Sequence, residues 1–233
     1  MKPLLLTAIA LLTGLALAGC RSPAPTPAAD PEANLTQDGL RPLVRSGFAR
    51  AWVRPGTSFA EYDRFRARYE EISYRRPPGS DRGMLGGIGG DNFALPAGVK
   101  RSLEESLRTI FQTEITRGAE WRTVDANGAG VLLVRVALGD LFVHAPIGTL
   151  GGDDLMWIDS LGEVTLLVEL YDSETKELIG RLLERRAWTT GVNRPIRATV
   201  GAATYEAHRI FRAWAKRLRS LLDAMKDVDP AAS

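Results

Sequence analysis

Residues 131–143 read Val-Leu-Leu-Val-Arg-Val-Ala-Leu-Gly-Asp-Leu-Phe-Val, the most apolar strand-like run in the chain. Valine and other β-branched residues favour the extended conformation. The most apolar strand of a sheet is expected near its centre. These residues therefore predict a central strand, and we expect Val134 to lie in the core.

The two apolar runs that follow predict a hairpin. One face of residues 164–172 carries only aliphatic side chains, from Val164, Leu166, Val168 and Leu170. Residues 172–177 read Asp-Ser-Glu-Thr-Lys-Glu, a polar loop, and residues 178–188 return with arginines between apolar positions. We expect Val168 to be buried together with Val134.

Three further strands are predicted upstream of the central one. Residues 48–54 alternate and stop at Pro55-Gly56, a turn pair. Residues 62–74 alternate with a phase slip between Tyr69 and Ile72, which indicates either a bulge at Glu70 or Glu71 or two short strands. Residues 120–124 form a short strand, closed by the Asn127-Gly128 turn.

Two segments carry helical spacing. Between Pro96, which suits a first turn, and Gly118, which suits a helix end, apolar residues recur at positions 99, 103, 107, 110 and 111. A second helix is predicted over residues 201–227. This order of elements predicts an α+β fold: a mostly antiparallel sheet of about five strands with two amphipathic helices packed on it.

The last helix separates apolar from basic side chains. Its apolar stripe consists of Phe211, Trp214, Leu218, Leu221, Leu222 and Met225, and a possible contact face on the opposite side consists of Arg209, Arg212, Lys216 and Arg219. Such a run of charges is usually a solvated surface. The alternative is that this basic face meets anionic lipid headgroups or an acidic partner.

The amino terminus predicts a membrane anchor. The apolar run from Leu4 to Leu17 is followed by Ala18-Gly19-Cys20, which resembles a bacterial lipoprotein signal with cleavage after Gly19 and lipid on Cys20. At about 14 residues the run is shorter than the ~20 that a transmembrane helix needs. An ordinary secretory signal is the other alternative, but Cys20 is the only cysteine and lies where the lipobox requires it. The predicted layout is a signal at 1–19, a lipidated, Pro-rich tether at 20–40, one domain at 41–228 and a tail at 229–233.

Several of these segments resemble one family. The resemblance lies in Trp52-Val-Arg-Pro-Gly56, in Tyr62 opening a strand, in the helix from Leu95, in Asn127-Gly128 before Leu132 and in the acidic hairpin 169–178. In these features the chain resembles the bacterial lipoprotein family called domain of unknown function 3313. The resemblance covers nearly the whole mature chain and implies no catalytic residues, because the family has none to transfer.

Composition and motifs exclude several functions. The formal net charge is +2, and losing Lys2 with the signal would leave +1, so no nucleic-acid partner is indicated. The two histidines, His144 and His208, have no cysteine or H-E-x-x-H motif beside them, so we expect no metal site and no cofactor. Acidic residues in loops (Asp81, Asp91, Asp153 and Asp154) are expected to be solvated, with weak binding of a cation as the alternative. The Gly-rich loops 75–94 and 144–161 are candidate contact sites.

These observations predict a non-enzymatic lipoprotein of the cell envelope. We expect it to act by protein contact at the periplasmic face of the outer membrane, since Arg21 follows the anchor rather than the Asp that retains lipoproteins in the inner membrane. An inner-membrane location is the alternative. The alternative function is an envelope hydrolase acting on peptidoglycan or lipid, which would show a pocket with convergent titratable side chains. A contact protein would instead show an exposed apolar or aromatic patch.

Overall fold

The computed structural model describes residues 25–27, 35–75, 95, 97–118, 120–143, 157–158, 160–189, 196–197 and 199–228. The predicted signal with Gly19 and Cys20, residues 76–94, His144, the acidic pair Asp153 and Asp154 and the tail 229–233 lie outside these residues.

In the described residues eight strands form one sheet, in the order β1-β2-β3-β9-β8-β6-β4-β5. Their bounds are β1 Thr26–Pro27, β2 Arg41–Val44, β3 Arg50–Val53, β4 Arg64–Tyr69, β5 Arg122–Thr123, β6 Val131–Val143, β8 Gly162–Asp172 and β9 Leu178–Ala187. A separate pair joins β7 (Trp157–Ile158) to β10 (Ile196–Arg197). The prediction of about five strands was therefore too low, because β1 and β2 are too short for an alternating pattern to reveal them.

The centre of the sheet matches the prediction. β6 has the predicted bounds and pairs with β8, which forms the predicted hairpin with β9. Along β8 every second residue is buried and those between are half-buried, so one face of the sheet is covered. Val134 and Val168 are both fully buried, which confirms the expected core.

β4 departs from the antiparallel expectation. It runs parallel to β6 on one side and to β5 on the other. Parallel neighbours require a long crossover between them, and α1 lies in the chain between β4 and β6. The sheet is consequently mixed, although most of its pairs are antiparallel.

The predicted irregularity after Tyr69 is present. Glu70 N donates to Val136 O and Ser73 N donates to Leu138 O, so three residue steps of this segment match two of β6. One residue is therefore inserted around Glu71 and Ile72, and the pairing resumes with a bridge between Tyr74 and Leu141. The insertion turns Ile72 into the core, where it is buried.

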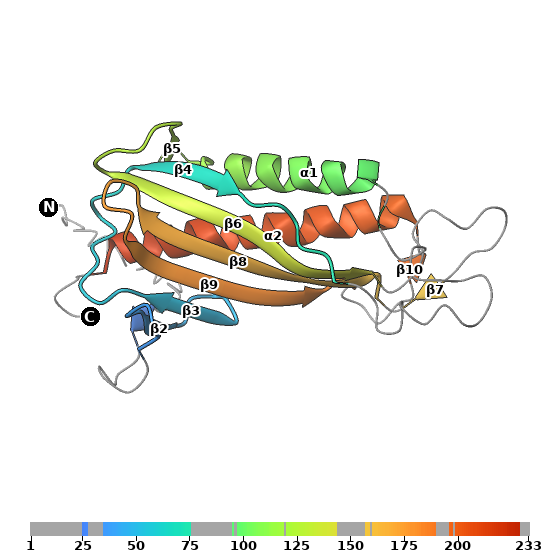
Figure 1. Ribbon diagram of the computed structural model, residues 1–233, viewed down its shortest axis with the longest axis horizontal. Helices are drawn as coiled ribbons and strands as arrows, with labels where there is room; N and C mark the ends of the chain where they lie inside the picture. Colours follow the sequence, from blue (N-terminus) through green and yellow to red (C-terminus); the bar gives the residue numbers. More distant parts are fainter. Residues whose placement is uncertain are drawn as a thin grey trace, which may run out of the picture.

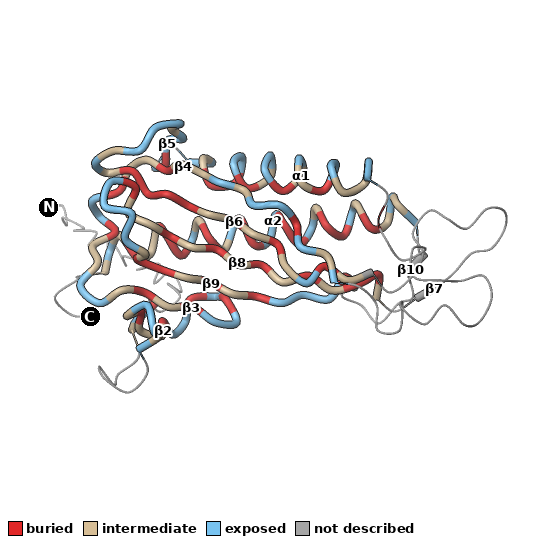
Figure 2. The backbone as a smooth tube through the Cα atoms, in the orientation of Figure 1, coloured by how far each residue is buried: buried red, intermediate tan, exposed pale blue. Residues whose placement is uncertain are grey.

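Two helices, α1 (Ala97–Ile115) and α2 (Val200–Lys226), lie side by side along the sheet (Figure 1). Figure 2 shows each helix alternating between buried and exposed residues from turn to turn. The predicted apolar stripe of α2, including Phe211, Trp214 and Leu218, is buried in one core shared with α1 and the sheet. Thr199 caps α2, since its hydroxyl accepts a hydrogen bond from Ala202 N.

The first described residues of the chain lie on the sheet. Pro25 is buried, and Thr26 and Pro27 pair with Val44 and Leu43 of β2. These residues fall inside the range predicted as a tether, 20–40. Part of that range therefore lies against the domain.

Candidate interaction site at the open edge of β4

β5 covers only the beginning of β4. Arg64 and Phe65 pair with Arg122 and Thr123, and the last contact is the hydrogen bond from Val124 N to Phe65 O at 3.0 Å. Beyond that point β4 continues to Tyr69 with β6 as its partner on one side. Among the described residues no strand pairs with 66–69 on the side away from β6, so in this part of the chain they form an open sheet edge.

The backbone groups at this edge have a defined direction. Asp63 O and Phe65 O accept hydrogen bonds from the β5 side, whereas Glu70 N donates to Val136 of β6. Because successive residues of a strand direct their N–H and C=O groups to opposite sides, those of Ala67 and Tyr69 point away from β6. An edge strand of this kind offers free donors and acceptors to another extended chain.

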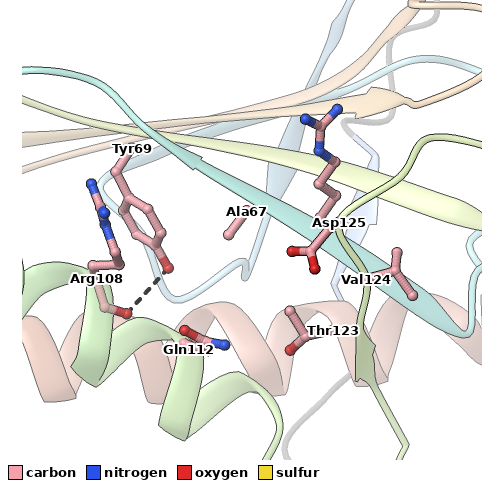
Figure 3. Close-up of a pocket in the computed structure, with 8 residues that line it drawn as sticks. Ala67, Tyr69, Arg108, Gln112, Thr123, Val124 and Asp125 are labelled. Atoms are coloured by element: carbon pink, nitrogen blue, oxygen red, sulfur yellow. Dashed lines mark hydrogen bonds between the residues drawn. The ribbon is translucent and has the colours of Figure 1, made fainter.

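A cleft of about 330 Å³ lies at this edge (Figure 3). Residues of β4 form one wall of the cleft and residues of α1 form another, and the segment after β5 closes one end. The lining residues are Arg66, Ala67, Tyr69, Arg108, Gln112, Thr123, Val124 and Asp125. The cleft thus combines free strand backbone with polar side chains from a neighbouring helix.

Tyr69 spans the cleft from β4 to α1. Its hydroxyl donates to Arg108 O at 3.3 Å, and the guanidinium of Arg108 lies 5.6 Å from the centre of its ring. Burial raises the pKa of Tyr69 to about 12, although the charge of Arg108 opposes the rise. Tyr69 is therefore protonated at neutral pH and serves as a hydrogen-bond donor rather than as a base.

The charge in the cleft favours an anionic ligand. Arg66 and Arg108 place two guanidinium groups there against one carboxylate, Asp125. Arg66 donates to Asn127 Oδ1 at 2.9 Å, an uncharged partner, so its charge is not neutralised by that bond. These groups suit the binding of a carboxylate better than proton transfer to a substrate.

The four residues of the predicted basic face do not share one environment. Arg209 is ion-paired with buried Glu206 at 2.7 Å and donates to Thr189 O. Arg212 lies 3.8 Å from the buried carboxylate of Glu114 on α1. Lys216 is exposed, and no ion pair is found for it among the described residues.

Arg219 closes the end of the neighbouring helix. Its guanidinium donates to Arg117 O at 2.9 Å and to Glu114 O at 3.4 Å, where α1 ends without a basic residue of its own. Carbonyl groups at a helix end lack partners within the helix and attract positive charge. The helical spacing predicted that these basic residues share one face of α2, but it could not predict that Arg212 and Arg219 contact the end of α1. Contact of this face with headgroups stays a prediction.

The described residues hold few of the other features expected of a site. His208 lies between the helices, 2.8 Å from Ser106 Oγ. In this part of the chain no group of three or more His, Cys, Asp or Glu could hold a metal ion. The large exposed apolar side chains found there are Leu35, Val44 and Tyr205, so the described surface lacks the broad apolar patch expected of a contact protein. None of the helices in the described residues is long and apolar enough to cross a bilayer.

Comparisons with known proteins give only remote likenesses. No protein-family model and no curated protein matches the chain. Among solved structures it is similar to PelC from Paraburkholderia phytofirmans, a dodecamer, at 11% identity and a TM-score of 0.36, covering 77% of this chain and 97% of that one. It is also similar to a Xanthomonas campestris protein of the domain of unknown function 330 family, at 15% identity and a TM-score of 0.37, covering 73% of this chain and 87% of that one.

Likenesses this distant carry no conclusion about function. The resemblance to the domain of unknown function 3313 family is not supported by a family model and stays a prediction.

Proposed function

We propose that this chain is a lipid-anchored protein of the bacterial cell envelope that works by binding a partner protein. In this proposal residues 1–19 are removed, Cys20 carries the lipid and residues 41–228 form the domain. The domain lies at the periplasmic face of the outer membrane, with an inner-membrane location as the alternative. The partner contributes an extended, acidic segment that adds to the open edge of β4.

The open edge of β4 is the observation that carries the proposal. Strand addition draws its affinity from main-chain hydrogen bonds and its specificity from neighbouring side chains. Ala67 and Tyr69 direct their N–H and C=O groups toward the incoming segment, and Arg66 and Arg108 lie where its side chains would pass. A carboxylate on the segment would meet a guanidinium in a charge-assisted hydrogen bond, stronger than a neutral one.

The edge can be tested by removing a single N–H. Because the N–H of Ala67 points away from β6, Ala67→Pro deletes an edge donor and leaves the pairing with β6 intact, and proline is tolerated on edge strands. A photo-crosslinking residue at Gln112, in intact envelopes, should form a discrete adduct that Ala67→Pro abolishes. Ala67→Ser keeps the N–H and should keep the adduct.

Two further variants check that the adduct is specific to the edge and depends on its charge. The same crosslinker at Glu174, exposed in the β8–β9 loop, should not give that adduct. Arg108→Glu reverses an exposed charge without touching the sheet and should weaken the adduct if the segment is acidic. An adduct that persists in Ala67→Pro, with an unchanged melting temperature, overturns the assignment of the edge.

A further inference from the structure

The start of β1 limits how far the domain can lie from its anchor. Pro25 is buried and Thr26 is already paired with Val44, so the chain is held on the sheet from residue 25. Five residue steps separate Cys20 from Pro25. Even fully extended, five steps span no more than about 18 Å. A tether counted from 20 to 40 would reach several times farther.

The antiparallel pairing of β1 with β2 shows where the anchor segment leaves the sheet. Moving from Thr26 toward Cys20 follows the direction from Val44 toward Arg45. The chain therefore leaves beside the turn that joins β2 to β3. We call the exposed residues of this turn and its flanks the anchor corner: Val44, Arg45, Gly47, Ala49 and Arg50.

The anchor corner is apolar and basic. Val44 is 44% exposed and is one of three large exposed apolar side chains in the described residues. Arg45 and Arg50 are exposed, and no ion pair is found for either within the described part of the chain. The turn itself is held from inside, because Phe48 is buried and its N–H donates to Ser46 Oγ at 3.3 Å. Its charged side chains are thus presented outward on a fixed backbone.

The neighbouring strand adds further positive charge. Arg50 lies opposite Leu183 of β9, so β9 continues past the corner with Arg185, which is ion-paired with Glu163, and with Arg186. Arg186 and Arg217 share one buried carboxylate, Glu184, each at 2.6 Å. Two cations around one anion leave positive charge at this end of the sheet.

We propose that the anchor corner contacts the bilayer and binds the phosphate groups of anionic phospholipid headgroups. This inference rests on the lipid attachment proposed above. A corner held within about 18 Å of the lipidated residue reaches the headgroup layer, where arginine is attracted by the negative surface potential and valine by the acyl boundary. The open edge of β4 lies near the far edge of the sheet, since β1 and β5 are the two outermost strands. Seven strand spacings separate those edges, about 33 Å at ~4.8 Å each, so the partner site faces away from the bilayer.

The orientation can be measured because Cys20 is the only cysteine. Once Cys20 carries lipid, an introduced cysteine is the single free thiol for a fluorophore. The lipidated full chain is reconstituted in phosphatidylethanolamine–phosphatidylglycerol vesicles that contain a headgroup-attached spin-label quencher. A fluorophore at Ala49→Cys should lose most of its emission, and one at Asp125→Cys, exposed in the β4 cleft, should keep it.

The charge of the anchor corner is then changed in a chain whose tether has been lengthened, so that the short tether alone cannot hold the corner at the bilayer. In a chain with a Gly-Ser linker inserted between Ala24 and Pro25, Arg45→Glu with Arg50→Glu should abolish the quenching at residue 49, and moderate salt should reduce it. Vesicles of phosphatidylcholine alone should give weaker quenching, because they lack net negative charge. Loss of quenching with an unchanged melting temperature assigns the effect to the corner rather than to unfolding.

The failures can be told apart. A protein that washes off the vesicles in carbonate overturns both the lipid attachment and this inference. A protein that stays attached but is quenched equally at residues 49 and 125 overturns the inference alone. Quenching at residue 49 that does not respond to the two charge reversals overturns the headgroup binding.

Discussion

Asp172, the last residue of β8, links the segment before β4 to the β8–β9 loop through one carboxylate. Its Oδ2 accepts a hydrogen bond from the Tyr62 hydroxyl at 2.9 Å, and its Oδ1 accepts from the N–H groups of Glu174 and Thr175 in the β8–β9 loop. Burial acts to raise the pKa of Asp172, but the hydrogen bonds from Thr175, Tyr62 and Glu174 outweigh it and hold that pKa below its ordinary value. The ionised form is therefore the one that the fold stabilises.

Replacing Asp172 by Asn should cost about 1–2 kcal/mol of unfolding free energy at about pH 7, because the charge-assisted acceptor is lost. A carboxyl with a lowered folded pKa contributes fully above its unfolded pKa of about 3.9 and loses that contribution as the pH falls through the folded pKa. The difference between wild type and variant should therefore shrink below about pH 4. Urea unfolding across this range measures it, with Glu174→Gln in the same loop as a control. A difference that does not change with pH contradicts the role of the charge.

Single-residue truncations at Val134 and Val168 test the packing of the core. Each is fully buried in the middle of its strand, on β6 and β8. Truncation to alanine removes buried methyl groups and leaves a cavity, so each change should cost about 2 kcal/mol. For a domain of this size that lowers the melting temperature by about 4–8 °C. Thr165→Ala, on the half-buried face of β8, is the matched control and should melt close to wild type.

At the scale of elements, buried carboxylates join the helices to their neighbours. Glu184 of β9 binds Arg217 of α2, and Glu114 of α1 lies near Arg212 of α2. A buried carboxylate left without its cation is costly, because the charge has lost its hydration. The arginines of α2 are therefore structural in large part, although the helix period alone marks them as a surface stripe.

Arg219 and Lys216 should separate structural from surface roles within this stripe. Arg219→Gln removes donors from the carbonyl groups at the end of α1 and should lower the unfolding free energy by about 1–2 kcal/mol. Lys216→Gln changes an exposed charge and should leave stability within about 0.5 kcal/mol of wild type. Thermal and urea unfolding of the two variants decides the matter. Equal effects would contradict the contact seen between Arg219 and α1.

Binding to anionic liposomes tests the membrane hypothesis for the same residues. If Arg209, Arg212, Lys216 and Arg219 bind headgroups, the domain without Cys20 should bind at low salt, and their joint replacement by Gln should abolish the binding. Because Arg219 also supports α1, the comparison is made with variants of equal stability. Lys216→Gln alone is the cleanest of them.

For the whole molecule, the anchor can be tested without disturbing the fold. Cys20 precedes the first described residue, so Cys20→Ser should leave the melting temperature of the domain unchanged. If lipid on Cys20 holds the protein, the variant should move from the membrane to the soluble fraction and retain its signal. Membrane fractionation with a carbonate wash measures this. A variant that still resists carbonate shows that something other than this lipid holds the chain.

The sequence predicted those features of the fold that a local residue pattern determines. β6 could be bounded at 131–143 because its apolar residues specify an extended, buried strand whatever its neighbours are. The parallel partner of β4 could not be predicted, since alternation reports which face is buried and not which strand lies alongside. β1 was missed because Thr26 and Pro27 are a two-residue strand in a Pro-rich segment. The β4 cleft depends on where β5 ends relative to β4, which no local signal encodes.

The small size of β1 has a mechanical consequence. A load on the lipid anchor reaches the sheet through two residue pairs, whereas ten pairs join β6 to β8. β1 can therefore peel away while the centre of the sheet stays intact, as expected for the least stable unit of a fold. In the described residues the chain after β1 is next tied to the sheet at Asp38, whose carboxylate is ion-paired with Arg181 of β9 at 2.7 Å. Peeling as far as Asp38 lengthens the tether from about 18 Å to at most about 65 Å, at ~3.6 Å per residue. The chain between the lipid and the sheet can therefore lengthen under force and shorten again when β1 re-pairs with β2.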